Sequence, residues 1–348
     1  MWMIKPIFVA IASSFLALPA HAAKFQTISS EPLSQQDVFS GRCTHLMTGA
    51  IEPGDAHRFE AMLDQLPPQD HDDLNFVICM NSGGGNLTEA LKIGEMIHRS
   101  FFGTFIDEGS ECLSACAVAF MHGRIAYWES FVDFRMLHPG GTLGFHAPSL
   151  NLGANADLVP ATLVDAAFSA AMQNVSALTD SAARNVQSSA RPVIPLGLLS
   201  DMLATPSEEM IYADTLHRTF RWQVTVFPVG LSAPEGFDLE VGYMQLCMNI
   251  RYELSPQTTQ REHSGEIATR QLYDWHQNTQ HVSLPSVADG HRIVKMGEVF
   301  EQQCSFKYNK ERDLFETNYY VEGRFQGTRW LRPVYLFDPN TQLHVLRP

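Results

Sequence analysis

The sequence predicts an α/β fold with a mainly parallel sheet, followed by a smaller β-rich domain. Two observations predict this arrangement. Between residues 74 and 148, apolar runs of strand length alternate with segments of helical periodicity. After about residue 222, short β-like runs with turns between them replace that pattern. The length of 348 residues agrees with two domains, because a single hydrophobic core rarely grows so large.

The first 22 residues predict a secretory signal peptide. Lys5 supplies a positive charge, residues 7–20 form a short apolar run, and the tripeptide that ends at Ala22 is a small-residue cleavage site. The run is shorter than the ~20 residues that a membrane-spanning helix needs. We therefore expect a periplasmic protein that keeps no membrane span after cleavage of residues 1–22.

The charge balance limits the partners. The chain carries 38 acidic and 24 basic residues, a formal net charge of −14. Nucleic-acid-binding proteins present basic surfaces, so this composition argues against a nucleic-acid partner. It also disfavours binding to an anionic membrane surface.

The α/β pattern is built around a turn of three glycines. Residues 74–80, LNFVICM, form an apolar run of strand length that leads into this turn. Asn86 and Glu89 then stand at the spacing of a capping box. From residue 87 to residue 97, apolar side chains recur on one helical face. We expect a buried strand, a glycine turn and an amphipathic helix, in this order.

Further elements follow at similar spacing. Residues 103–109 predict a second short strand, and residues 113–123, rich in small side chains, predict a second helix. Residues 142–148, TLGFHAP, predict a third strand that ends at a proline. Such alternation is typical of βαβ units. The change of pattern places the α/β domain at residues 23–221 and the β-rich domain at residues 222–348.

An even number of cysteines in an exported protein indicates disulfides. The six are Cys43, Cys79, Cys112, Cys116, Cys247 and Cys304. Cys112 and Cys116 are close enough to pair locally, and we expect a second disulfide between Cys247 and Cys304. The sequence leaves the pairing of the remaining two open. A metal site is the alternative for the local pair, but a second ligand pair at zinc spacing is missing, so we expect no metal.

Ser114 lies between the two neighbouring cysteines and is a candidate nucleophile. Residues four apart on a regular helix have β-carbons ~5–6 Å apart, whereas a disulfide needs ~3.5–4.5 Å. A Cys112–Cys116 bridge therefore requires Cys112 to precede the helix, which places Ser114 at the turn. A serine on a sharp strand-to-helix turn is suited to nucleophilic attack. The alternative is a small residue packed inside a helix.

Two other motifs supply the partners of a nucleophilic serine. The segment NSGGGN, residues 81–86, exposes backbone N–H groups that can bind an oxyanion. A phosphate site is less well supported, because the Lys-[Ser/Thr] of a P-loop is absent. His138 and His146 are candidate general bases, and His146 ends an apolar strand, where a side chain can enter a cleft.

The three motifs together resemble the Clp-protease proteolytic subunit family, within the Clp/crotonase superfamily. The segments CMNSGGGNLTEALKIGEMI, CLSACAVAF and the stretch from Pro139 to His146 resemble its glycine turn, its nucleophile turn and the approach to its catalytic histidine. The resemblance covers roughly residues 40–220. It implies stacked βαβ units, a peptide or protein substrate and no cofactor, and ring assembly in the superfamily makes a homo-oligomer an expectation.

The resemblance also implies roles for individual residues. Ser114 takes the place of the nucleophile and His146 that of the general base. Gly84, Gly85 and the Ala115 N–H take the place of the oxyanion hole. His138 falls in what resembles an insertion.

The acid that orients the histidine is the main departure from the family. Thr205 stands at its place, and Asp201, one helical turn earlier, is the alternative acid. The sequence thus leaves a Ser–His dyad and a displaced triad open. A second departure is Cys112, which replaces a small residue two positions before the serine.

Two functions follow from these observations. The first is an exported serine hydrolase, a peptidase that uses Ser114 and His146. The alternative is a non-catalytic binding or assembly module of the cell envelope that acts through its C-terminal domain, motivated by the missing acid. Acyl-CoA chemistry ranks below both, because an exported protein rarely meets coenzyme A.

Overall fold

The computed structural model describes most of the α/β part and portions of the C-terminal part. The described residues are 22–34, 37–66, 75–127, 130–148, 161–183, 192–227, 242, 245–247, 249, 291–296, 302–309, 314–321, 324–331, 333–337 and 340–346. Apart from Ala22, the expected signal peptide lies outside these residues. Within them, none of the helices combines the length and the hydropathy required to cross a bilayer.

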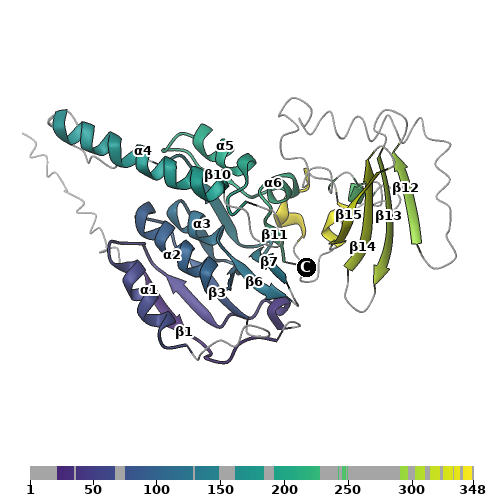
Figure 1. Ribbon diagram of the computed structural model, residues 1–348, viewed down its shortest axis with the longest axis horizontal. Helices are drawn as coiled ribbons and strands as arrows, with labels where there is room; N and C mark the ends of the chain where they lie inside the picture. Colours follow the sequence, from purple (N-terminus) through teal and green to yellow (C-terminus); the bar gives the residue numbers. More distant parts are fainter. Residues whose placement is uncertain are drawn as a thin grey trace, which may run out of the picture.

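A six-stranded sheet forms the centre of a mixed α/β fold (Figure 1). Its strands, in spatial order, are β1 (Lys24–Thr27), β2 (His45–Thr48), β3 (Phe76–Asn81), β4 (Phe102–Ile106), β8 (Arg135–Leu137) and β11 (Thr225–Val226). The edge strand β1 is antiparallel to β2, and all other neighbours are parallel. The mainly parallel sheet expected from the alternating pattern is therefore present.

Three helices surround the core beside this sheet, namely α1 (Asp55–Leu63), α2 (Leu87–Arg99) and α3 (Ala115–Phe120). At the start of α2, the Asn86 side chain accepts a hydrogen bond from the Glu89 N–H at 3.0 Å. Only half of the expected capping box forms. The Glu89 carboxylate instead accepts from the N–H groups of Gly54 and Ala56 at the start of α1, at 3.1 and 3.0 Å. One carboxylate thus caps a neighbouring helix and ties α1 to α2.

A second, three-stranded sheet carries the elements that position the candidate site. Its order is β10 (Ile211–Tyr212), β9 (Thr142–Phe145) and β5 (Glu111–Leu113). Strand β5 is parallel to β9, and β10 is antiparallel to β9. A separate hairpin consists of β6 (Arg124–Tyr127) and β7 (Ser130–Asp133). Further helices along the described chain are α4 (Ala161–Ala183), α5 (Leu196–Ala204) and α6 (Leu216–Arg221).

The C-terminal part contains an antiparallel four-stranded sheet, drawn apart from the central sheet in Figure 1. It consists of β12 (His291–Met296), β13 (Gln302–Asn309), β14 (Leu314–Val321) and β15 (Arg324–Leu331), paired in sequence order. The period-2 pattern in this region therefore corresponds to strands. The division into two domains stays a prediction.

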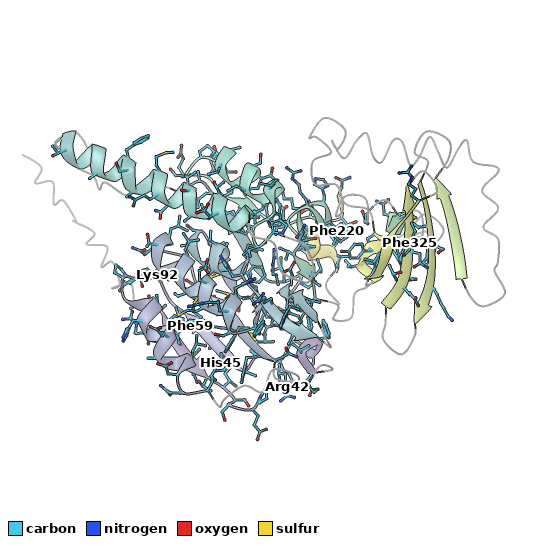
Figure 2. All side chains as sticks on the ribbon, in the orientation of Figure 1. Arg42, His45, Phe59, Lys92, Phe220 and Phe325 are labelled. Carbon is cyan, nitrogen blue, oxygen red and sulfur yellow. A yellow bond between two sulfur atoms is a disulfide. The ribbon has the colours of Figure 1, made fainter. Side chains whose placement is uncertain are left out.

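The chain beyond β15 returns to the α/β part. The ring of Tyr335 stacks on that of Phe220 in α6 at 4.4 Å, on the flank turned toward the four-stranded sheet in Figure 2. The Leu343 N–H donates to the Asp214 carbonyl, and the Leu216 N–H to that of Thr341. Four side chains of this segment join the main core cluster: Val334, Phe337, Leu343 and Leu346. C-terminal residues thus complete the α/β core.

The six-stranded sheet extends past residue 221, where the sequence predicts the domain boundary. Strand β11 pairs with β8 in the six-stranded sheet, and Phe227 packs into a buried cluster on that sheet. The sequence predicts a β-like run at residues 221–230, but a strand with only two paired residues does not show which sheet it joins. The α/β sheet therefore continues to Val226.

The structure contains three disulfides. The expected bridges Cys112–Cys116 and Cys247–Cys304 are present, and the third joins Cys43 to Cys79. None of the six cysteines is free. Three disulfides are compatible with an oxidising, extracytoplasmic compartment.

One buried histidine makes the core sensitive to acid. His45 on β2 is fully buried, with its ring edge-on to Phe76 and Phe102 (Figure 2). Its Nδ1 contacts the Thr44 hydroxyl at 2.9 Å, and its Nε2 has no hydrogen-bond partner among the described residues. Burial lowers the pKa of His45 to about 4, because the apolar surroundings disfavour the imidazolium.

We expect His45→Phe to reduce the acid sensitivity of folding. The unfolded chain takes up a proton near pH 6.5 and the folded one only near pH 4, so stability falls as the pH drops through this window. Between these two pKa values, the free energy of unfolding falls by up to about 1.4 kcal/mol for each pH unit of acidification. Denaturant unfolding at pH 7 and pH 5 should therefore show a smaller loss in the variant. An equal loss in both proteins would contradict the assignment.

Candidate active site

Ser114 lies at a sharp turn between a strand and a helix. Strand β5 ends at Leu113 and α3 begins at Ala115, so Ser114 occupies the position between them. Its backbone has φ 55° and ψ −123°, a conformation that residues other than glycine rarely adopt. Such strain costs on the order of 1–3 kcal/mol and persists only where the surroundings enforce it. The serine is thus at the turn and not inside the helix.

The backbone of Ser114 is held on both sides, whereas its side chain is not used as a cap. The Ser114 N–H donates to the Gly144 carbonyl at 2.9 Å, and its carbonyl accepts from the Val118 N–H at 3.2 Å. The side chain forms no capping hydrogen bond with α3 and is half-buried. The hydroxyl is therefore available for another partner.

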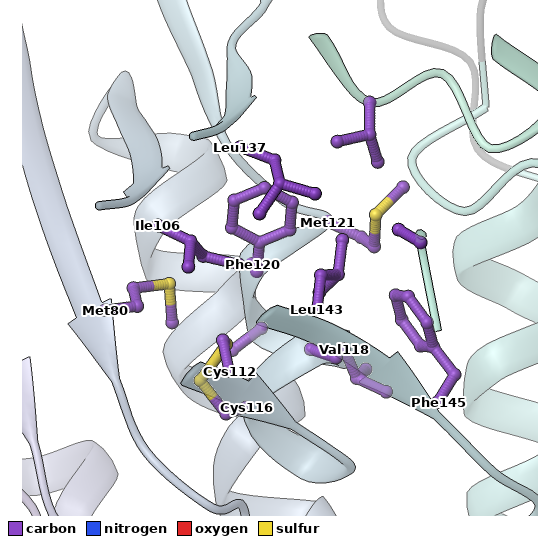
Figure 3. Packing of buried hydrophobic residues seen from close by; sticks show 14 of the residues in the cluster. Met80, Ile106, Cys112, Cys116, Val118, Phe120, Met121, Leu137, Leu143 and Phe145 are labelled. Atoms are coloured by element: carbon purple, nitrogen blue, oxygen red, sulfur yellow. A yellow bond between two sulfur atoms is a disulfide. The ribbon is translucent and has the colours of Figure 1, made fainter. Parts of the chain in front are cut away.

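The Cys112–Cys116 disulfide joins the two arms of this turn. Cys112 belongs to β5 and Cys116 to the first turn of α3, with their Cα atoms 5.2 Å apart. Both are fully buried, and Figure 3 shows the bridge packed near Val118 and Leu143. The bridge fixes strand and helix around Ser114, and its bonded sulfurs provide no thiolate ligand for a metal.

The glycine turn lies directly against Ser114. Gly84 has φ 98°, and a Cβ on it would lie 2.6 Å from the Leu113 carbonyl oxygen and 2.8 Å from the Ser114 Cβ. It would also lie 3.1 Å from the Ala115 nitrogen. Hydrogen bonds between Ser82 and β5, from Ser82 N–H to Glu111 carbonyl and from Leu113 N–H to Ser82 carbonyl, hold the turn there. Only glycine leaves the space beside the hydroxyl open.

The backbone donors near Ser114 differ in availability. Ala115 is the first residue of α3, where an N–H has no acceptor within the helix. The bridge between Ile51 and Gly85 uses the Gly84 carbonyl and the Asn86 N–H, so it leaves the Gly85 N–H unused. By contrast, the Gly84 N–H donates to the Ser82 hydroxyl at 3.2 Å. Gly84 therefore contributes open space, and Ala115 and Gly85 are the better donors.

His146 follows β9, the strand paired with the one that precedes Ser114. Strands β5 and β9 are parallel, with Leu113 opposite Gly144, so both residues follow the same ends of neighbouring strands. Neighbouring strands lie ~4.8 Å apart. The His146 ring is half-buried, and its Nδ1 lies 2.7 Å from the Ala147 carbonyl oxygen. Because a carbonyl only accepts, Nδ1 carries the proton and Nε2 of the neutral ring is a free acceptor. This tautomer suits a general base.

His138 occupies a different place. It follows β8 in the six-stranded sheet and is largely buried. Its Nδ1 accepts a hydrogen bond from the Gly140 N–H at 3.0 Å, and its ring lies 6.1 Å from that of Phe227. The role of this histidine is to close the turn after β8.

Neither Thr205, at the place of the family's acid, nor Asp201, the alternative acid, has a recorded side-chain contact with His146. Thr205 accepts at its carbonyl from the Ala147 N–H, at 3.0 Å, so it is next to the histidine as expected. The Asp201 carboxylate accepts from the Arg221 Nε at 2.9 Å and from the Trp222 indole at 2.9 Å. Asp201 thus forms an ion pair with Arg221, and its role as a displaced acid stays a prediction. The contacts favour the dyad.

Three groups near the site carried no sequence signal. The Ala147 carbonyl, Arg221 and Trp222 belong to no motif, and the two side chains are about 20 residues from the aspartate they bind. In the sequence, only the charge of Arg221 and the size of Trp222 distinguish these two residues from their neighbours.

Comparisons with known proteins add little to this geometry. No family model matches the chain, and no curated protein matches it. Among solved structures, a mutant of ClpP1 from Listeria monocytogenes is similar, with a TM-score of 0.32 and 14% sequence identity. The match covers 51% of this chain and 85% of that one. At this TM-score the likeness carries no argument about the site, which rests on the contacts described above.

We expect the double variant Cys112→Ala/Cys116→Ala to react more slowly at Ser114. Removing the bridge costs about 2 kcal/mol of stability for so short a loop and lets the turn relax. The rate of labelling by a fluorophosphonate probe should fall about tenfold, by analogy with other losses of precise positioning. Unfolding in denaturant gives the stability of the same sample.

The matched control is Cys43→Ala/Cys79→Ala. That bridge closes a longer loop, with a sequence separation of 36, so its loss should cost about 4 kcal/mol. It should leave labelling of the folded protein unchanged. Equal effects of both double variants on labelling would show that the bridge at the turn has no special role.

Proposed function

We propose that the protein is an exported serine peptidase with Clp/crotonase-like stacked βαβ units, in which Ser114 is the nucleophile and His146 the general base. The observation that carries the proposal is the strained backbone of Ser114 at a braced strand-to-helix turn. This turn lies against Gly84 and beside a histidine whose Nδ1–H is held by a carbonyl. A packing residue requires none of these features.

The chemistry follows from the placement of these groups. His146 Nε2 accepts the hydroxyl proton as the Ser114 oxygen attacks a carbonyl carbon. The negative charge that develops on the carbonyl oxygen is stabilised by the Ala115 and Gly85 N–H groups. The imidazolium then returns its proton to the leaving amine. Water, activated by the same nitrogen, releases the acyl group from Ser114 and restores the hydroxyl.

The substrate class and the assembly rest on the sequence resemblance. A peptide bond is the proposed target because the motifs around Ser114 and His146 resemble those of a peptidase family. A homo-oligomer is proposed on the same ground. The location proposed is the periplasm, supported by the signal-peptide pattern and by the three disulfides.

Incubation with a mixture of defined peptides, followed by mass spectrometry of the products, tests the activity. We expect cleavage by the wild-type protein and none by Ser114→Ala. Cleavage that persists in Ser114→Ala would reject the nucleophile. A folded wild-type protein that binds peptides without cleaving any would favour the alternative, a non-catalytic envelope module, which the missing carboxylate at His146 also suggests.

A further inference from the structure

We propose that Asp201 is a positioning residue for His146, which it holds through Arg221, Trp222 and Thr205 without contacting the ring. This inference rests on the proposed function, because it concerns the base of the same reaction. It assigns a role to the carboxylate that the dyad does not use.

The ion pair is partly buried and has a defined geometry. Asp201 lies on α5 and Arg221 at the end of α6, with side chains 12% and 15% exposed. Arg221 donates from Nε to one carboxylate oxygen at 2.9 Å and from its terminal nitrogen to the other at 3.1 Å. The Trp222 indole adds a third bond at 2.9 Å. Such two-point pairing fixes orientation as well as distance.

The end of α5, which carries Asp201, is linked to His146 through Ala147, the residue that follows the histidine. Thr205 ends α5, and its hydroxyl donates to the Asp201 carbonyl at 2.8 Å. Its own carbonyl accepts from the Ala147 N–H at 3.0 Å. Ala147 in turn holds the His146 Nδ1 with its carbonyl. The end of α5 therefore anchors the peptide that fixes the tautomer.

The cluster also reaches the residue that precedes His146. The Trp222 indole packs edge-on against the ring of Phe145, with centroids 5.4 Å apart, and both rings are buried. Figure 3 shows Phe145 at the edge of the core cluster that contains the disulfide. The Asp201 carboxylate thus orients the indole that packs on Phe145, and the backbone carbonyl of Asp201 at the end of α5 holds Thr205, which binds Ala147.

The physical need for this support follows from the missing acid. In a triad, a carboxylate on Nδ1 orients the ring. Here a backbone carbonyl takes that place, and its position depends on how firmly the Ala147 peptide is fixed. Loss of the Asp201 carboxylate would remove the acceptor that Arg221 and the indole share, which weakens the link between α5 and α6 and lets the two helices shift.

The test compares rates of fluorophosphonate labelling of Ser114 in the full chain. We expect Asp201→Ala to lower the rate about 100-fold, as small displacements of catalytic groups do. Asp201→Asn keeps an oxygen for the indole or for Arg221 and should stay within about tenfold of wild type. An acid acting directly on His146 predicts a different result, in which Asn is as damaging as Ala, with losses of about 10⁴.

Arg221→Lys provides a second variant in case Asp201→Ala fails to fold. Lysine keeps the positive charge but cannot make the two-point contact, so the labelling rate should fall by an amount between those of Asp201→Asn and Asp201→Ala. The control is Asp214→Ala, which removes a partly exposed ion pair with Arg218, a residue of α6 like Arg221, at 2.6 Å. It should label at the wild-type rate.

The outcomes separate the two proposals. A folded wild-type protein that is not labelled at Ser114 overturns the proposed function and the inference with it. A labelled wild-type protein with unchanged rates in folded Asp201→Ala and Arg221→Lys overturns the inference alone. Equal losses in Asp201→Asn and Asp201→Ala would make Asp201 a direct acid and also overturn it.

Discussion

Replacing His146 with alanine is expected to lower the rate of fluorophosphonate labelling at Ser114 by about 10²–10⁴, the range typical of general bases. The Ser114 hydroxyl is a weak nucleophile unless a neighbour accepts its proton. His146 follows the strand adjacent to the one that precedes Ser114, and its Nδ1 donates to the Ala147 carbonyl. Its Nε2 is therefore the acceptor available for that proton.

His138→Ala is the matched control, because it removes the other histidine of the same segment. Its Nδ1 accepts the Gly140 N–H beside the other sheet, so its loss should affect local stability without changing the labelling rate of folded protein. Denaturant unfolding separates the two effects. Similar losses of labelling in both variants would show that neither histidine acts as a specific base.

Gly84→Ala is expected to reduce labelling by about 10²–10³, comparable to the loss of one oxyanion donor. The added methyl group would lie 2.8 Å from the Ser114 Cβ and 3.1 Å from the Ala115 nitrogen, distances at which something must move. The movement would displace the serine or block the approach of the substrate carbonyl to Ala115. Labelling kinetics of folded variant protein measure the effect.

Gly54→Ala separates this collision from backbone strain. Gly54 has φ 94°, close to the φ of Gly84, but a Cβ there meets no atom within 4 Å. Alanine at positive φ destabilises both variants, but only in Gly84→Ala does the added methyl group clash with Ser114. If Gly54→Ala lost as much labelling as Gly84→Ala, general destabilisation and not a clash at Ser114 would explain the effect.

Features set by local chemistry were predictable from the sequence. The glycine turn needs residues without side chains, and Cys112 and Cys116 can pair only if the helix starts after Cys112. The structure has this arrangement, with β5 ending at Leu113. The apolar run before His146 also predicted a strand there, and β9 ends at Phe145, one residue before the histidine. The mainly parallel sheet followed from the alternation of strands and helices.

Features set by distant contacts were not predictable. Strand β5 has three residues, too few to show a period, so the sequence pointed to the preceding strand, β4, as the one leading to Ser114. The partners of Asp201 come from α6, and spacing alone suggested an acid where the fold forms an ion pair. Residues beyond 330 return to the core through backbone pairing near Asp214, which no side-chain pattern records.

The central claim is that Ser114 is an activated nucleophile, and mapping of a covalent adduct tests it most directly. Wild-type protein, Ser114→Ala and heat-unfolded wild type are treated with a fluorophosphonate probe, digested and analysed by tandem mass spectrometry. The account predicts a single adduct on Ser114 in folded wild type and none in the other two samples. An adduct on another residue, or no adduct in folded wild-type protein, would contradict it.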